Sequence, residues 1–265
     1  MNNLIGVSGK IGSGKDTVGK IIQYLTSNVR DDFDCQGLYW ADSRYQIKKF
    51  AAKLKQIVSV LTGYSLEELE KQEVKDTVLG KEWWYYSFFD GPGRRPTRIN
   101  NKKEAELLCE EAWGTVHSAY LKLVKPTVRQ MLQEVGTDAM RNIIHPNVWV
   151  NSLFSDYIPE TTWDSSKWNK KISNWIITDM RFPNELLAIK ERGGINIRVN
   201  RFDKTQDSLV KSRSGKYLNP EGPTNNHYSE TALDDARFDY TINNNGTIEE
   251  LIEQVKEILL KENVI

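Results

Sequence analysis

Cysteine and histidine are scarce in this chain, and their scarcity argues against several classes of site. The two cysteines, Cys35 and Cys109, lie far apart in the sequence, so they support neither a disulfide framework nor a cysteine-based zinc site. The histidines, His117, His145 and His227, are scattered without the spacing of metal ligands. We therefore expect neither a disulfide-stabilised fold nor a zinc centre.

An excess of charge of either sign is also lacking. The 36 lysines and arginines balance the 36 aspartates and glutamates, so the formal net charge is zero. This balance argues against a protein that is held on a nucleic-acid polymer mainly by phosphate contacts. A local basic pocket for a small phosphorylated ligand remains compatible with it.

Long apolar runs are missing too. No run approaches the roughly 20 apolar residues of a membrane span, which argues against a membrane partner. The N-terminus is typical of a strand, without the charged segment and apolar core of a secretory signal. We therefore expect a soluble, cytoplasmic protein, and its 265 residues suffice for a sizeable core.

What the sequence does contain is a glycine-rich loop. Gly9, Gly14 and Lys15 match the first seven positions of G-x-x-x-x-G-K-[ST]. An apolar run at 4–7 predicts a strand before this loop, and residues 16–25 predict a helix after it. This strand–loop–helix setting is typical of a phosphate-binding loop.

Phosphate chemistry explains these residue types. Glycines let the backbone turn its N–H groups inward, and a helix N-terminus adds free donors with a partial positive charge. Lys15 carries a full charge that can reach the β- and γ-phosphates of a nucleotide. The eighth position of the motif holds Asp16, and the hydroxyl of Thr17 comes one residue later, so the ligand of Mg²⁺ is left open between them.

The rest of the pattern predicts a parallel α/β sheet flanked by helices. Strands are predicted at 175–178, 195–199 and 238–242, and helices at 48–62, 128–144, 148–157 and from Pro183 to Gly193, with one or two helices at 102–123. Capping boxes predict a short helix after Ser65 and Glu68, and a last helix that Thr247 and Glu250 cap and that runs to about 261. A turn-rich loop is predicted at 90–96 and a polar connector at 159–173. Because strands and helices alternate at both ends, right-handed βαβ units are expected. The chain is predicted to form a single domain over 1–265, with a mainly helical, lid-like insertion at about 64–125.

A second signal lies at the end of the strand predicted at 175–178. Asp179 follows it directly, where an acid can hold Mg²⁺, and Arg181 could offer a fork to phosphate. Glu185 falls one turn into the next helix and could face the same crevice. The simpler interpretation is that Asp179 caps the next turn and Arg181 pairs with it.

A third signal lies on the helix predicted at 128–144. Arg129, Gln133, Gly136 and Thr137 share one face at α-helical offsets, where amides can read base edges and arginine can clamp phosphate. Gly136 costs up to about 1 kcal/mol relative to alanine inside a helix, so a close approach is expected there. The alternative is an ordinary solvated face.

These segments together resemble the phage-type deoxynucleoside monophosphate kinases, in order and approximate spacing over most of the chain. The likeness is carried by residues 8–17, Phe50-Ala51, Leu54-Lys55, Gln133, Gly136-Thr137-Asp138, Trp149, Asp179, Arg181, Glu185 and 244–251. Residues 64–125 and 202–227 agree least. The resemblance implies a P-loop kinase fold and transfer of the γ-phosphoryl group of ATP, with Mg²⁺, to a (deoxy)nucleoside 5′-monophosphate.

The resemblance also implies roles for individual residues. Catalytic roles fall to Lys15, Arg129, Asp179 and Arg181. Nucleotide and Mg²⁺ binding fall to Gly12, Ser13, Gly14, Lys15, Asp16, Thr17, Arg201, Asn244 and Gly246, with Asp16 and Thr17 as the metal ligands. Acceptor binding falls to Lys55, Gln133, Gly136, Thr137, Trp149 and Glu185. The segment from His227 to Glu230 resembles the family without an assignable role, and a homodimer rests on family analogy alone.

Three other functions compete with this hypothesis. A P-loop kinase could act on another small acceptor, such as dephospho-coenzyme A. A GTP-dependent switch would read guanine through Asn200-Arg-Phe-Asp203, a degraded form of Asn-Lys-x-Asp. A non-catalytic nucleotide-binding scaffold could use the aromatic stretch at 83–89, with Trp113, Trp163 and Trp168, as a partner surface.

Water exclusion gives a further expectation. Phosphoryl transfer must keep water from the reacting phosphate. We therefore expect residues 64–125 or 202–227 to close over the phosphates.

Overall fold

The structure divides the chain into two compact units. It is a computed structural model, and it describes residues 3–28, 31–34, 36–37, 42–89, 91, 96–159, 172–201 and 231–265. Unit 1 comprises residues 1–52 and 147–265, and unit 2 comprises residues 53–146. The chain thus enters unit 1, builds unit 2 as one continuous segment, and returns to unit 1.

Unit 1 is organised around a five-stranded parallel sheet with the order β2-β6-β1-β7-β8. Its strands are β1 (Leu4–Ser8), β2 (Gln46–Lys48), β6 (Trp175–Ile177), β7 (Ile195–Asn200) and β8 (Tyr240–Asn243). In the register, Ile5 lies opposite Ile176 on one side and Ile195 on the other. All four pairings are parallel, as the alternation of strands and helices predicts.

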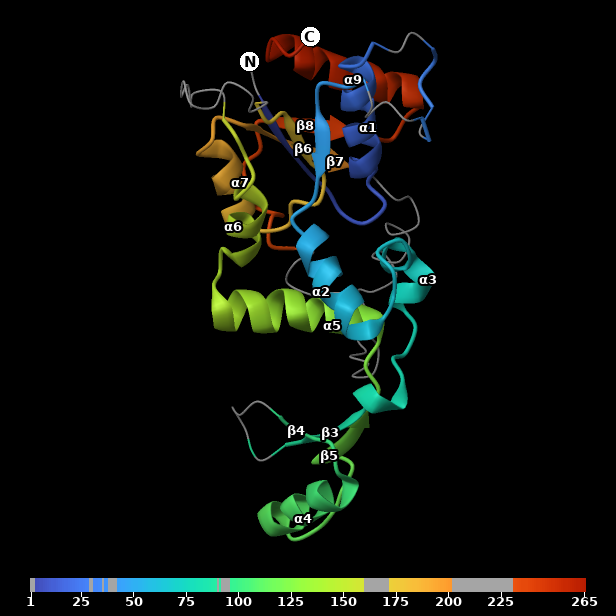
Figure 1. Cartoon of the computed structure of the whole chain (residues 1–265), viewed down its shortest axis with the longest axis vertical. Helices are drawn as coiled ribbons and strands as arrows, with labels where there is room; N and C mark the ends of the chain where they lie inside the picture. Colours follow the sequence, from blue (N-terminus) through green and yellow to red (C-terminus); the bar gives the residue numbers. More distant parts are fainter. Residues whose placement is uncertain are drawn as a thin grey trace, which may run out of the picture. The chain divides into compact units, whose positions relative to one another are not determined.

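Helices cover both faces of this sheet (Figure 1). Helices α1 (Lys15–Leu25) and α9 (Ile248–Lys261) lie on one face, and α6 (Val148–Phe154) and α7 (Pro183–Lys190) lie on the other. The core between the sheet and the first pair buries Ile21 and Ile22 of α1 with Val255 and Leu259 of α9. The apolar face of each helix therefore fixes the residues at its N-terminus against the carboxyl ends of the strands.

The helix predicted at 48–62 begins later than expected. Residues 46–48 instead pair with β6 as the edge strand β2, so α2 spans Ala52–Thr62. Gly63 ends it with a positive φ of 78°, which glycine adopts without strain. Three short helical turns follow, η2 (Glu68–Glu70), α3 (Gln72–Lys75) and η3 (Lys81–Trp83), and the expected reciprocal bonds of Ser65 and Glu68 precede η2.

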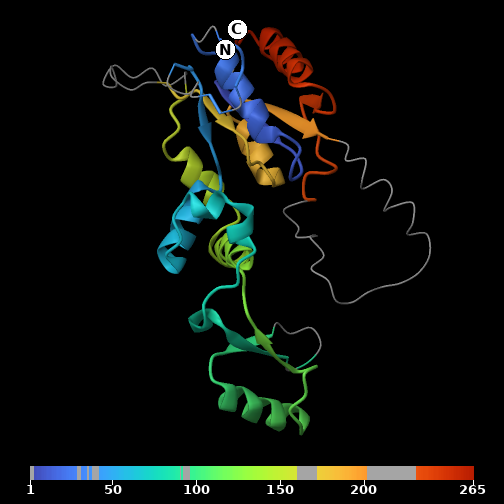
Figure 2. The ribbon, with the colours of Figure 1, turned by 90° about the vertical axis from the view of Figure 1, so that its right-hand side faces the viewer.

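Unit 2 also contains a three-stranded antiparallel sheet that the prediction of helix and loop at 64–125 lacked. Its order is β4-β3-β5, from β3 (Tyr85–Phe88), β4 (Thr97–Ile99) and β5 (Leu121–Val124). Helix α4 (Lys102–Trp113) covers this sheet (Figure 2), so the prediction of one or two helices at 102–123 is wrong over its last part, where β5 begins. Phe88, Ile99, Ala105 and Cys109 form the small core beneath α4.

A long helical segment closes unit 2. Helix α5 (Val128–Gln133) begins at a capping box of Thr127 and Gln130, and η4 (Glu134–Ile144) continues it as a π-helix. The predicted extent of 128–144 is therefore confirmed. Its hydrogen-bond pattern is not α-helical after residue 133, because a π-helix bonds i to i+5.

Parts of the sequence prediction lie outside the described residues: Cys35, most of the turn-rich loop at 90–96, most of the connector at 159–173 with Trp163 and Trp168, the loop at 202–227 with Phe202 and Asp203, and the segment from His227 to Glu230. Among the helices that the structure describes, none is long and apolar enough to cross a membrane.

Candidate functional site

The glycine-rich loop connects β1 to α1 as the motif predicts. Gly12 and Gly14 have φ angles of 77° and 91°, in the left-handed region that glycine adopts without a Cβ clash. Gly14 is the N-cap of α1, and Lys15 is the first residue of the helix. Gly9 is also restricted, because a Cβ there would lie 2.7 Å from the carbonyl oxygen of Val199. The loop thus presents backbone donors and Lys15 at a helix N-terminus, where anions bind.

Ser13 and Asn244 join this loop to the turn after β8. The side-chain amide of Asn244 donates to the carbonyl oxygen of Ser13 at 2.9 Å. The Ser13 hydroxyl is buried and has no hydrogen-bond partner within the described residues. An unpartnered buried hydroxyl is costly, so it fits a loop that completes its bonds with a ligand.

The turn after β8 is also held by side-chain hydrogen bonds. Thr247 and Glu250 form the predicted capping box of α9. A Cβ on Gly246 would lie 1.6 Å from a carboxylate oxygen of Glu250, so glycine leaves room for that box. Arg201 is exposed directly after β7, the strand beside β8. The predicted nucleotide-binding residues of unit 1 therefore occupy neighbouring carboxyl ends of β1, β7 and β8.

Asp16 offers an exposed carboxylate beside the loop. Its side chain is 59% exposed and lies 3.6 Å from the Lys49 ammonium. The hydroxyl of Thr178, at the end of β6, donates to Asp16 Oδ1 at 2.8 Å. Carboxylate and hydroxyl oxygens are the ligand type that Mg²⁺ prefers, so Asp16 and the adjacent Thr17 fit that ion. The described residues contain no group of three or more His, Cys, Asp or Glu arranged to hold a metal.

Asp179 follows β6, but its carboxylate is engaged by the backbone. Its two oxygens accept from the amides of Phe50 and Ala51 at 2.8 and 2.9 Å. Burial raises the pKa of the Asp179 carboxyl above its ordinary value, against the opposing effects of these amides and of the Lys49 and Arg181 charges. Asp179 therefore acts as a cap, which was the simpler interpretation of the sequence. The turn that it caps is the one that leads into α2, not the turn that follows Asp179.

Glu185 holds the backbone of the same loop. It is 1% exposed, and one carboxylate oxygen accepts from the amides of Arg181 and Phe182 at 2.7 and 3.1 Å. Pro183 begins α7 at its first turn, as predicted. Glu185 therefore positions the backbone of Arg181, and its carboxylate is buried beneath the loop.

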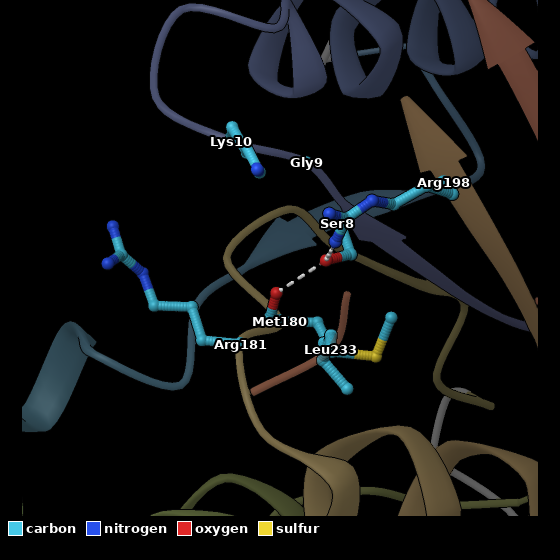
Figure 3. A pocket seen from close by; sticks show the side chains of 7 residues that line it. All are labelled: Ser8, Gly9, Lys10, Met180, Arg181, Arg198 and Leu233. Carbon is cyan, nitrogen blue, oxygen red and sulfur yellow. Dashed lines mark hydrogen bonds between the residues drawn. The ribbon is translucent and has the colours of Figure 1, made fainter. Parts of the chain in front are cut away.

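A small pocket opens beside these residues, at the ends of β1, β6 and β7. Its lining consists of Ser8, Gly9, Lys10, Met180, Arg181, Arg198 and Leu233 (Figure 3). Sequence reasoning found Arg181 but missed Lys10 and Arg198. Arg198 could have been found from the sequence, because it is a charged residue inside a predicted parallel strand, and such strands are usually apolar.

The other predicted acceptor residues belong to unit 2, apart from the buried Trp149 on α6. Lys55 pairs with Glu70, and Arg129 pairs with Asp76 at 2.9 Å. The close approach expected at Gly136 is made by Leu54, since a Cβ at 136 would lie 2.8 Å from the Leu54 side chain. Gln133 ends α5 and Thr137 lies in η4, so the shared α-helical face predicted for them is interrupted at residue 134.

Comparison with known proteins gives one family. The model of the deoxynucleotide monophosphate kinase family matches residues 97–255. The deoxynucleoside-5′-monophosphate kinase of Escherichia phage T5 is 24% identical over 239 residues, which cover 80% of this chain and 82% of that protein. The deoxynucleotide monophosphate kinase of Enterobacteria phage T4 is 27% identical over 134 residues, or 50% of this chain and 45% of that protein. The crystal structure of TT1252 from Thermus thermophilus aligns over 98% of this chain and 96% of its own, at 16% identity and a TM-score of 0.30.

Proposed function

Because this chain belongs to the deoxynucleotide monophosphate kinase family, whose model spans more than half of it, we propose that it transfers the γ-phosphoryl group of ATP to deoxynucleoside 5′-monophosphates. The products are ADP and a deoxynucleoside diphosphate. The observation that carries the proposal is the loop between β1 and α1, with Gly12 and Gly14 at positive φ and Lys15 at the helix N-terminus.

The residues of unit 1 supply positioning and charge. The loop amides and Lys15 hold the phosphates of ATP, and the Ser13 hydroxyl gains its missing partner there. Asn244 fixes this loop against the turn that faces the base, together with Gly246 and Arg201. Asp16 and Thr17 would hold Mg²⁺, which neutralises charge on the phosphates when bound.

The acceptor needs little covalent assistance. Its phosphate is already a nucleophile near neutral pH, so alignment and charge neutralisation account for the catalysis. Arg181, whose backbone Glu185 fixes, contributes a guanidinium to the transferred group, and Asp179 fixes the turn before α2. Lys55, Arg129, Gln133, Gly136, Thr137 and Trp149 are proposed for acceptor recognition by family likeness.

The setting of the enzyme is also part of the proposal. The two relatives are named as kinases of deoxynucleoside monophosphates, which supports action on free nucleotides, and their phage origin supports action inside a host cell. The balanced net charge agrees with a small-molecule substrate.

The test is coupled ADP release with ATP and Mg²⁺, using each deoxy- and ribonucleoside monophosphate in turn. We expect turnover with a subset of the deoxynucleotides. Lys15→Ala should lower kcat by about 10²–10³-fold, because a preorganised charge at the developing phosphate is lost. Lys20→Ala, five residues along the same helix, is the matched control and should retain turnover. Equal activity of both variants, or silence across the panel while ATP still binds, would contradict the proposal.

A further inference from the structure

The pocket beside the glycine-rich loop contains more positive charge than the phosphate-loop motif requires. Lys10, Arg181 and Arg198 all line it, and they come from the loop after β1, the loop after β6 and the strand β7 (Figure 3). Lys10 occupies an unspecified position of the motif, and Arg198 lies about 190 residues away from it in the sequence. Three chain segments thus line one small pocket, in which the side chain of Arg181 extends away from those of Lys10 and Arg198 and would turn inward to meet a bound anion (Figure 3).

Arg198 is much less exposed than Lys10, and it has a carboxylate partner. Its side chain is 14% exposed, and it donates to Ser8 Oγ at 3.2 Å and to Asp234 Oδ1 at 2.9 Å. Removing a guanidinium from water is costly unless its donors are satisfied. Those two bonds leave donors of the five-donor guanidinium fork for a further acceptor.

Ser8 ties Arg198 to the rest of the pocket. Its hydroxyl accepts from Arg198 and donates to the carbonyl oxygen of Met180 at 3.0 Å. The cation on β7 is therefore connected through β1 to the residue directly before Arg181. Because Ser8 and Arg198 stand on adjacent paired strands, the pocket is built on rigid elements.

Asp234 balances the positive charge of this pocket, although it is not one of the lining residues. One carboxylate oxygen meets Arg198, and the other lies 3.6 Å from the Lys10 ammonium. The side chain of Asp234 is 35% exposed, so it can turn toward solvent without breaking a buried core. A carboxylate and a phosphate accept the same donors in similar geometry, and a phosphate carries more charge and more oxygens.

We propose that Asp234 occupies, in the nucleotide-free protein, the place of a nucleotide phosphate group, which displaces it and binds Lys10, Arg181 and Arg198. Arg198 is then a further substrate-contacting residue, and Asp234 is an internal competitor that keeps the pocket neutral. That the phosphate belongs to a nucleotide rests on the proposed function. The anion-binding pocket itself does not.

The test measures binding rather than turnover. Asp234→Asn keeps the shape and one acceptor oxygen but removes the competing charge. Calorimetric titrations would use ATP with Mg²⁺, ADP with Mg²⁺, the deoxynucleoside monophosphates and inorganic pyrophosphate. We expect the variant to bind roughly two- to fivefold more tightly, which is the range of an exposed ion pair. Asp239→Asn is the matched control, because Asp239 has the same 35% side-chain exposure and pairs with Lys190, outside the pocket. It should change no affinity.

The probes separate the two sources of phosphate. A gain for ATP that ADP lacks identifies the donor's terminal phosphate, and a gain for the monophosphates identifies the acceptor phosphate. Arg198→Gln should weaken the same probe, and Arg198→Lys should restore part of the loss. Unchanged or weaker binding of every probe by Asp234→Asn would overturn the inference and make Asp234 a structural partner of Arg198. If no monophosphate is turned over but pyrophosphate still binds more tightly, the proposed function fails and the pocket stands.

Discussion

The contact between Gly14 and Asn244 makes a quantitative prediction about the nucleotide-binding edge of the sheet. A Cβ on residue 14 would lie 2.3 Å from the Asn244 side-chain nitrogen, and the φ of 91° is unfavourable for any other residue. Gly14→Ala should therefore impose two separable penalties. One is backbone strain, and the other is displacement of the Asn244 amide from the carbonyl oxygen of Ser13.

The magnitudes follow from these two terms. The left-handed conformation costs a non-glycine residue about 1–2 kcal/mol. The lost hydrogen bond costs about 1 kcal/mol, so Gly14→Ala should lower the free energy of unfolding by about 2–3 kcal/mol. Asn244→Ala loses the same bond, and the double variant loses it only once. The double variant should therefore be about 1 kcal/mol more stable than the sum of the single losses implies.

Equilibrium urea unfolding of the four proteins measures this cycle. Gly12→Ala is the control, because residue 12 has a similar φ of 77° and no atom within 4 Å of a Cβ. The decrease in the free energy of unfolding caused by Gly12→Ala should add to the decrease caused by Asn244→Ala within about 0.5 kcal/mol. Additive losses for Gly14→Ala and Asn244→Ala would refute the reasoning, since they would show that the amide does not contact the loop in solution.

Two further predictions concern the carboxylates after β6. Glu185→Ala should lower the free energy of unfolding of the nucleotide-free protein by about 1–3 kcal/mol, because the two backbone amides that donate to the Glu185 carboxylate lose their acceptor; a loss confined to substrate binding would contradict this role. Asp179 should give a pH dependence, because its folded-state pKa is raised above the ordinary value of 3.8. The stability that Asp179 contributes is fully present below pH 3.8 and is lost as the pH rises through the raised pKa. In urea unfolding, the free energy of unfolding of the wild type relative to that of Asp179→Asn should therefore fall as the pH rises from 3.8 through the raised pKa. A difference between the two proteins that stays constant with pH would exclude the raised pKa.

Much of unit 1 could be predicted from the sequence, because its signals are local. Apolar runs bounded by glycine and polar residues predict β1 and β7, and the spacing of Thr247 and Glu250 predicts the start of α9. The glycine motif predicts the loop because the positive φ angles at residues 12 and 14 can be met without strain only by glycine.

The remainder depends on contacts between distant residues. Residues 46–48 form a strand only because β6 pairs with them, although the apolar positions of 48–62 continue a helical period. The aromatic residues of β3 acquire their strand pairing from β4 and β5. Asp179 was predicted at the end of its strand, but its amide partners lie about 130 residues earlier in the chain. The ion pair of Arg198 and Asp234 likewise joins residues that lie 36 positions apart, so no local pattern in the sequence predicts it.

The sheet order of unit 1 has a consequence for synthesis on the ribosome. β6 lies between β2 and β1, so these two N-terminal strands have no neighbour in the sheet until residues 175–177 have been made. Unit 2 is continuous over residues 53–146 and can complete its contacts earlier. The apolar strand β1 therefore stays without its sheet neighbours while unit 2 is made, and the glycine-rich loop gains its contacts with β7 and β8 only after those strands have been added.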